Sequence, residues 1–79
     1  MNYTLFYQIC KIPIQINSPR YKVRKYIFSD SRLINSETYT YSERNLNKLN
    51  KEINQNGYQF EYIESDNFDN IPYPNVNLN

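Results

Sequence analysis

The chain has 79 residues, a formal net charge of +1 and an aromatic content of 16% that includes nine Tyr. A domain of this length buries only about 60 to 65% of the surface that its unfolded chain exposes, so its independent stability is small. A single cysteine, Cys10, excludes an internal disulfide, and the absence of His removes the commonest metal ligand. A binding partner is therefore the expected source of additional stability.

The charges are distributed unevenly. Residues 11–32 carry six basic side chains and one acidic side chain, whereas residues 61–79 carry four acidic side chains and no basic one. The longest apolar runs are far shorter than the roughly 20 residues that a membrane span requires. Residues 1–7 lack the basic start and the small-residue cleavage site of a secretory signal. We expect a soluble chain with no removable N-terminal signal and no membrane insertion.

Residues 3–10 alternate between two faces, as expected for a strand. One face carries Tyr3, Leu5, Tyr7 and Ile9, and the other carries Thr4, Phe6, Gln8 and Cys10. Because both faces contain apolar residues, we expect this strand to lie in the centre of the sheet. The apolar alternation changes parity at Ile12, and Pro13 cannot donate to a sheet ladder. The register is therefore expected to break near Lys11.

A second alternating segment follows the turn signal at residues 17–19 and predicts a strand over residues 21–28. Tyr21, Val23 and Ile27 face one way, and the opposite face carries Lys22, Arg24, Tyr26 and Phe28. Residues 29–37 mix turn formers with Leu33 and Ile34, so we expect a loop with at most a short helical turn. Residues 38–41 predict a short β segment that leads into a helix.

The helix has clear boundary signals. Ser42 can cap it through its hydroxyl, and Glu43 places a negative charge at the positive end of the helix dipole. Gly57 is the only glycine of the chain and enters the left-handed region at little steric cost, so we expect the helix to end there. A narrow apolar stripe is expected to lie across the sheet and consists of Leu46, Leu49 and Ile53.

Residues 58–63 predict the last strand, with Tyr58, Phe60 and Tyr62 on one face. The apolar residues thin out from residue 65 onward and two prolines oppose regular structure, so residues 65–79 are expected to be extended or disordered until they meet a partner. The sequence thus predicts an α+β fold, a small antiparallel sheet of about three strands with one main helix in the order β-β-(β)-α-β. The domain is expected to span residues 1–64 and the tail residues 65–79.

The composition argues against catalysis. The chain offers no His, one Cys, and scattered carboxylates without metal-ligand spacing. A single glycine cannot build a glycine-rich loop that cradles phosphate groups. We therefore expect no enzyme activity and no metal site, and we expect Cys10 to be a small buried residue rather than a reactive thiol.

The segment of residues 20–26 interleaves basic and aromatic side chains. Such a pattern can track a nucleic-acid backbone while its rings stack on bases. The near-neutral charge and the acidic tail oppose that interpretation, because dedicated nucleic-acid binders have a stronger positive footprint. A solvated strand face and a contact with an acidic protein are the two other interpretations that the segment allows.

Several motifs occur together between residues 3 and 64. Tyr41-Ser42 leads into a polar helix, Ile53 stands four residues before Gly57, and a closing strand contains Phe60 and Ile63. Two earlier strand motifs accompany them, Leu5-Phe6-Tyr7-Gln8-Ile9 and the basic Tyr21-Lys22-Val23-Arg24. In this combination the chain resembles the CpcD-like linker domain of phycobilisomes.

This resemblance implies a non-enzymatic assembly protein that caps or joins phycobiliprotein discs, binds their α and β subunits and other linkers, and binds no nucleic acid. It implies no covalently bound cofactor, with aromatic side chains near the bilins of the partner. The chain is rich in Asn, Ile, Tyr and Lys, as is typical of proteins from AT-rich genomes. Together with the resemblance, this composition suggests a red-algal plastid and the stromal face of the thylakoid, or the cytoplasm in another source. The expected partner contacts are Arg20, Lys22, Arg24, Lys25, Tyr26, Tyr39 and Tyr41.

A second function from another class also fits the small size and the residue usage. It is a small nucleic-acid-binding or host-directed inhibitory module of a virus or mobile element. The two functions differ in salt dependence, because nucleic-acid binding weakens linearly with the logarithm of salt concentration.

Overall fold

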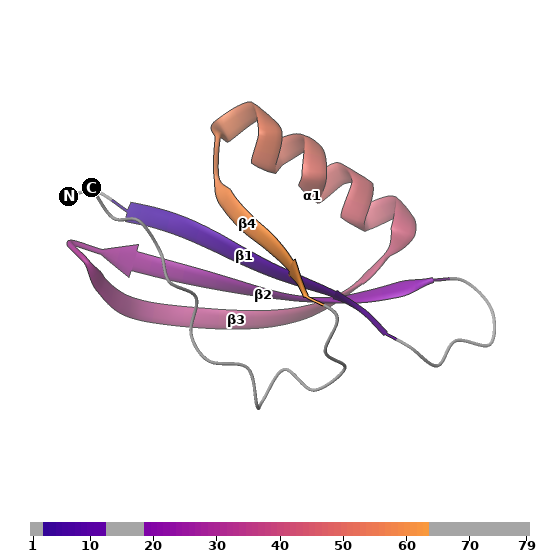
Figure 1. Cartoon of the computed structure of the whole chain (residues 1–79), viewed down its shortest axis with the longest axis horizontal. Coiled ribbons are helices and arrows are strands. Elements are labelled where there is room, and N and C mark those ends of the chain that lie inside the picture. Colours follow the sequence, from indigo (N-terminus) through magenta and orange to yellow (C-terminus); the bar gives the residue numbers. More distant parts are fainter. Residues whose placement is uncertain (1–2, 13–18, 64–79) are drawn as a thin grey trace.

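The computed structural model describes residues 3–12 and 19–63. Its elements, in chain order, are strands β1 (Tyr3–Lys11), β2 (Arg20–Ser29) and β3 (Arg32–Ser42), helix α1 (Glu43–Asn56) and strand β4 (Gln59–Ile63). The four strands form one sheet in the order β3-β2-β1-β4, and α1 packs on it (Figure 1). The predicted α+β class is confirmed. The sheet is mixed, because β4 runs parallel to β1 while the other neighbouring pairs are antiparallel.

Strand β1 lies between two other strands. It pairs with β2 from Tyr3↔Ser29 to Lys11↔Tyr21, and with β4 from Phe6↔Gln59 to Cys10↔Ile63. The five consecutive residues from Phe6 to Cys10 are buried, so both faces of β1 are buried at this point. The prediction of a central strand is therefore confirmed.

Strands β2 and β3 form a hairpin where a loop was expected. Asp30 and Ser31 turn the chain with positive φ angles of 52° and 70°, as the two-residue turns of hairpins require. The loop prediction for residues 29–37 is wrong because most side chains from Arg32 to Ser36 are exposed at the sheet edge, where no apolar alternation is needed. A register shift between Ile27 and Phe28 further blurs the pattern.

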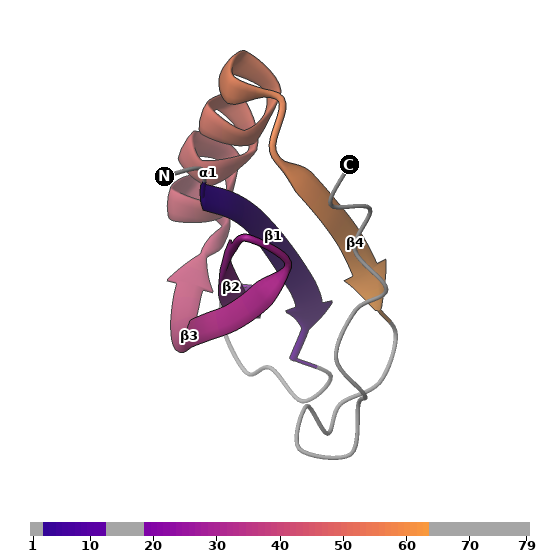
Figure 2. The same cartoon turned by 90° about the vertical axis from the view of Figure 1, so that its left-hand side faces the viewer.

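Helix α1 begins and ends where the sequence predicts. The Ser42 hydroxyl accepts a hydrogen bond from the Asn45 amide at 3.2 Å, and Gly57 takes a left-handed conformation with φ 67°. The Tyr58 amide then donates to the Ile53 carbonyl at 3.1 Å, which satisfies a carbonyl of the last turn. The helix lies against one side of the sheet (Figure 2).

The apolar residues form two clusters on opposite faces of the sheet. The cluster beneath α1 joins Tyr7, Ile9 and Val23 to the helix stripe of Leu46, Leu49 and Ile53, which confirms the predicted stripe. The cluster on the other face contains Phe6, Tyr26 and Phe28, with Leu33 packed against them.

Two sequence predictions fall partly or wholly outside the described residues. β1 ends at Lys11, and the expected register change beyond it concerns residues 13–18, which lie outside the described ranges. The tail assigned to residues 65–79 also lies outside them. Both remain predictions.

Replacing Gly57 tests the helix end. An added Cβ would meet no heavy atom within 4 Å, so the cost of Gly57→Ala is that of the left-handed backbone alone, about 1 to 2 kcal/mol of unfolding free energy. Gly57→Asn should cost less, because Asn tolerates this conformation better. Urea unfolding measures both variants. Asn47→Ala on the exposed side of α1 is the control, and equal stability of Gly57→Ala and wild type would contradict the account.

Candidate protein interface

The seven predicted contact residues do not share one surface. Alternate side chains of a strand point to opposite faces, and Val23 points into the cluster beneath α1. The face that carries α1 therefore also carries Lys25 of β2, together with Tyr39 and Tyr41 of β3, which pairs Val23↔Tyr39 and Tyr21↔Tyr41. The opposite face carries Arg20, Lys22, Arg24 and Tyr26. The basic and aromatic side chains of residues 20–26 are thus divided between two sides of the sheet.

Tyr26 is a core residue. Its side chain has 0% exposure, and its hydroxyl donates to Gln8 Oε1 at 2.7 Å. Gln8 in turn donates through Nε2 to Glu61 Oε1 at 2.7 Å, so hydrogen bonds connect β2, β1 and β4. Tyr26 does not offer its side chain to an external partner in this structure, which corrects its assignment as a contact residue.

Tyr39 and Tyr41 form an aromatic pair at the β3 edge of the sheet. Their rings are stacked, with centroids 5.9 Å apart and an interplanar angle of 19°. Tyr41 packs against the core beneath α1, whereas Tyr39 is 40% exposed. The Tyr39 hydroxyl donates to Glu37 Oε1 at 2.8 Å, and this bond raises the pKa of Tyr39. Their position on the edge strand β3 is compatible with the predicted role as partner contacts.

A second aromatic pair lies at the opposite edge of the sheet, on β4. Phe60 and Tyr62 meet edge to face with centroids 5.9 Å apart. They are 45% and 58% exposed, and the Tyr62 hydroxyl donates to Asn50 Oδ1 of α1 at 3.2 Å. Sequence analysis placed these rings on one face of the last strand but did not select them as contacts. The apolar stripe of α1 is narrow, and this feature of the sequence indicates that the helix cannot also cover the β4 edge of the sheet.

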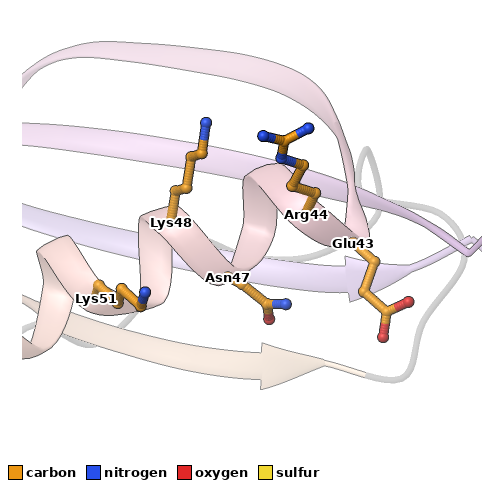
Figure 3. Close-up of a pocket in the computed structure, with 5 residues that line it drawn as sticks. All are labelled: Glu43, Arg44, Asn47, Lys48 and Lys51. Carbon is orange, nitrogen blue, oxygen red and sulfur yellow. The ribbon is translucent and has the colours of Figure 1, made fainter.

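The solvent side of α1 is basic. Arg44, Lys48 and Lys51 follow a spacing of four and three residues, which places them along one side of a helix. Together with Glu43 and Asn47 they line a surface groove. In Figure 3, Arg44 and Lys48 point to the same side, while Glu43 and Asn47 point the opposite way. None of these residues was among the contacts predicted from the sequence.

The side of the molecule that bears α1 thus combines two kinds of contact group. A basic helix shares this side with the Tyr39–Tyr41 pair of β3, of which Tyr39 is exposed, and with the exposed Phe60–Tyr62 pair of β4. Aromatic side chains and Arg are enriched in protein interfaces, and complementary charge steers association. We call this the helix-side surface and define it by Tyr39, Tyr41, Arg44, Lys48, Lys51, Phe60 and Tyr62.

The described residues also bear on two other features, a metal centre and a membrane span. No cluster of three or more His, Cys, Asp or Glu side chains among residues 3–12 and 19–63 has metal-binding geometry. Within the same ranges, no helix has both the length and the apolar character to cross a membrane.

Tyr7 has a strongly perturbed phenol beneath α1. Burial is the main cause that raises its pKa to about 12, and the negative charge of Glu52 adds to it. Tyr41 shares both influences, so its pKa is also raised by burial and then by Glu52. The Tyr7 ring lies 6.1 Å from that of Tyr58, between centroids, and is part of the core rather than of the helix-side surface.

No protein-family model matches the chain, and no curated protein or solved structure is significantly similar to it. The likeness to the CpcD-like linker domain therefore remains a prediction from the motifs in the sequence.

The raised pKa of Tyr7 predicts alkaline destabilisation. The folded protein keeps the phenolic proton at a pH where the unfolded chain, with a pKa near 10.0, has lost it. The stabilising contribution is complete below pH 10 and is lost as the pH rises towards about 12. Urea unfolding across this range should show falling stability, and Tyr7→Phe should reduce the decline.

Glu52→Gln provides the matched control for the electrostatic part. It removes the charge that opposes ionisation of Tyr7, so phenolate absorbance should develop at lower pH in this variant. Identical alkaline titrations and stability profiles in wild type and Tyr7→Phe would show that Tyr7 is not the responsible group.

Proposed function

We propose that the chain is a non-enzymatic linker protein that binds phycobiliprotein subunits and caps or joins their discs in a phycobilisome. The observation that supports this proposal most is the helix-side surface, where exposed aromatic rings and a basic helix share one side of the sheet. The motifs of residues 3–64 supply the identity of the partner, and the surface supplies the mode of binding.

The physical basis of binding follows from the two kinds of side chain. Phe60 and Tyr62 have large, exposed rings that lose little conformational freedom on binding, so they are suited to act as buried anchors. Arg44, Lys48 and Lys51 are solvated and steer the approach to an acidic subunit surface. Neither role needs a reactive group, a metal or a bound cofactor.

The same proposal gives the cellular setting. The aromatic pairs would lie near the bilins of the partner, without covalent attachment to this chain. The abundance of Asn, Ile, Tyr and Lys suits an AT-rich genome such as that of a red-algal plastid, with the protein at the stromal face of the thylakoid. In another source the corresponding place is the cytoplasm.

The nucleic-acid-binding or inhibitory module receives less support. Lys22 and Arg24 lie on the face whose aromatic side chains are buried, so the rings there are not available for stacking on bases. Tyr21 and Lys25 point to the other face. The segment of residues 20–26 therefore does not present one basic and aromatic track.

Substitution of the β4 aromatic pair tests the proposal. The double variant Phe60→Ser/Tyr62→Ser should weaken binding to purified phycobiliprotein trimers at least about tenfold, because truncated aromatic anchors commonly cost more than about 1.4 kcal/mol. Surface plasmon resonance at constant salt measures the affinity. Ile34→Ser is the matched control, since Ile34 is an apolar residue with 50% exposure near the β2–β3 turn.

The outcomes separate the candidate functions. The control should bind like wild type, and all variants should ignore single-stranded DNA. Wild-type protein that binds no phycobiliprotein would refute the linker function, and binding to single-stranded DNA that weakens linearly with the logarithm of salt would favour the nucleic-acid module. Equal binding by the double variant and wild type would refute the helix-side surface as the interface.

A further inference from the structure

Asn56 and Gly57 form the only Asn-Gly pair of the chain, at the point where α1 ends. Asn56 is the last residue of the helix, Gly57 follows it in a left-handed conformation, and both residues are exposed. The side-chain amide of an Asn can be attacked by the backbone nitrogen of the residue that follows it. Glycine has no Cβ to hinder this attack, so the pair combines a susceptible amide with an accessible nucleophile.

Both reacting groups are held by hydrogen bonds in the folded chain. Asn56 donates through Nδ2 to the Glu52 carbonyl at 2.8 Å, which turns its side chain back along the helix. The Gly57 amide donates to the Ile53 carbonyl, so its nitrogen keeps its proton and is directed into the last turn. Attack of this nitrogen on the Asn56 side chain requires both hydrogen bonds to open.

We propose that Asn56 is a deamidation site whose rate is set by local opening of the last turn of α1. When that turn opens, a base from solvent removes the Gly57 amide proton, and the nitrogen forms a bond to Cγ of Asn56. The bond between Cγ and Nδ2 breaks, and Nδ2 takes up a proton and leaves as ammonia, which gives a cyclic succinimide. Water then adds to one of the two ring carbonyls and breaks the bond from that carbon to the ring nitrogen. The product is aspartate when the bond to Cγ breaks and isoaspartate when the bond to the main-chain carbonyl carbon breaks.

The last turn of α1 is suited to local opening. It contains no basic side chain that would stabilise the negative end of the helix dipole, and Asn54, Gln55 and Asn56 are exposed. Its buried side chain is Ile53, which is 2% exposed and lies in the cluster beneath α1. Helix ends fray more readily than packed centres. The residues after Ile53 can therefore open while Ile53 stays in the core.

Solvent reaches this end of the helix. Asn56 and Gly57 line a surface hollow together with the first residues of β1, and a Cβ added at Gly57 would meet no heavy atom within 4 Å. The base that removes the amide proton and the water that opens the ring can therefore both come from bulk solvent. The reaction needs no enzyme, metal or cofactor.

Either product weakens the helix end. A carboxylate at residue 56 cannot donate to the Glu52 carbonyl, and it lies at the negative end of the helix dipole, four residues after the Glu52 carboxylate. Isoaspartate also adds a methylene to the main chain, which displaces the Gly57 and Tyr58 amides from the Ile53 carbonyl that both of them reach. The change lies directly before β4, the edge strand with the exposed aromatic pair. It does not depend on the proposed function, because it is a reaction of the chain with water.

Peptide mapping by mass spectrometry measures the reaction. Full-length protein is incubated at mildly alkaline pH, once folded and once unfolded in guanidinium chloride, and the fractions of aspartate and isoaspartate at residue 56 are followed with time. The folded protein should react at least about fivefold more slowly, because hydrogen bonds of the last turn must open first. The ratio of the two rates should equal the hydrogen-exchange protection of the Gly57 amide. That protection should be smaller than the protection of the amide of buried Val23, which reports global unfolding.

Gln55→Lys and Gln55→Glu form a matched pair of variants, because they place opposite charges in the last turn and leave Asn56 and Gly57 unchanged. The folded Lys variant should react about twofold more slowly than wild type and the folded Glu variant about twofold faster. Both should react like wild type when unfolded.

Three results would overturn the proposal. The first is an Asn56 that does not react even in the unfolded chain, which would show that it is no deamidation site. The second is an equal rate in the folded and unfolded chains, which would show that the helix end does not control the reaction. The third is a retardation that follows the protection of Val23 instead of Gly57, because the reaction would then need global unfolding.

Discussion

The burial of β1 on both faces is the constraint on which the rest of this structure depends. Its residues from Phe6 to Cys10 alternate between the cluster beneath α1 and the cluster on the opposite face. A strand with two buried faces needs strands on both sides and a covering layer above and below. β2 and β4 provide the neighbours, α1 covers one face, and the cluster of Phe6, Tyr26 and Phe28 packs on the other. The hydrogen bonds from Tyr26 through Gln8 to Glu61 cross this central strand and satisfy its one buried polar side chain.

The same constraint explains which side is free for a partner. A single helix of 14 residues with three buried side chains lies closest to β3 and β2, and it leaves the β4 edge of the sheet uncovered. Tyr39 of β3 and the Phe60–Tyr62 pair of β4 consequently remain exposed on the side of the sheet that bears the basic helix. The free energy of unfolding of a chain of this size is small. Burial of these rings against a phycobiliprotein would therefore stabilise both the complex and the fold. The proposed binding of a partner protein would thus account for the exposed rings of Tyr39, Phe60 and Tyr62.

Local signals in the sequence predict the parts of the fold that depend on local chemistry. Ser42 and Gly57 define α1 because capping and left-handed conformation depend on single residues. The β2–β3 hairpin was not predicted for two reasons. Asp30-Ser31 lacks the glycine that is usual in two-residue hairpin turns, and β3 is a polar edge strand. Tyr26 was misassigned because strand alternation gives the face but not what covers it. The exposure of Phe60 likewise depends on tertiary packing, whereas the basic row on α1 follows from the spacing of Arg44, Lys48 and Lys51 and could have been recognised in the sequence.

The central claim is that the helix-side surface holds a phycobiliprotein. The most direct measurement is to isolate the protein from its native source through moderate salt and record the visible and ultraviolet absorption of whatever remains bound. The account predicts strong bilin bands with no excess nucleic-acid absorbance. A colourless complex, or one dominated by nucleic-acid absorbance, would contradict it.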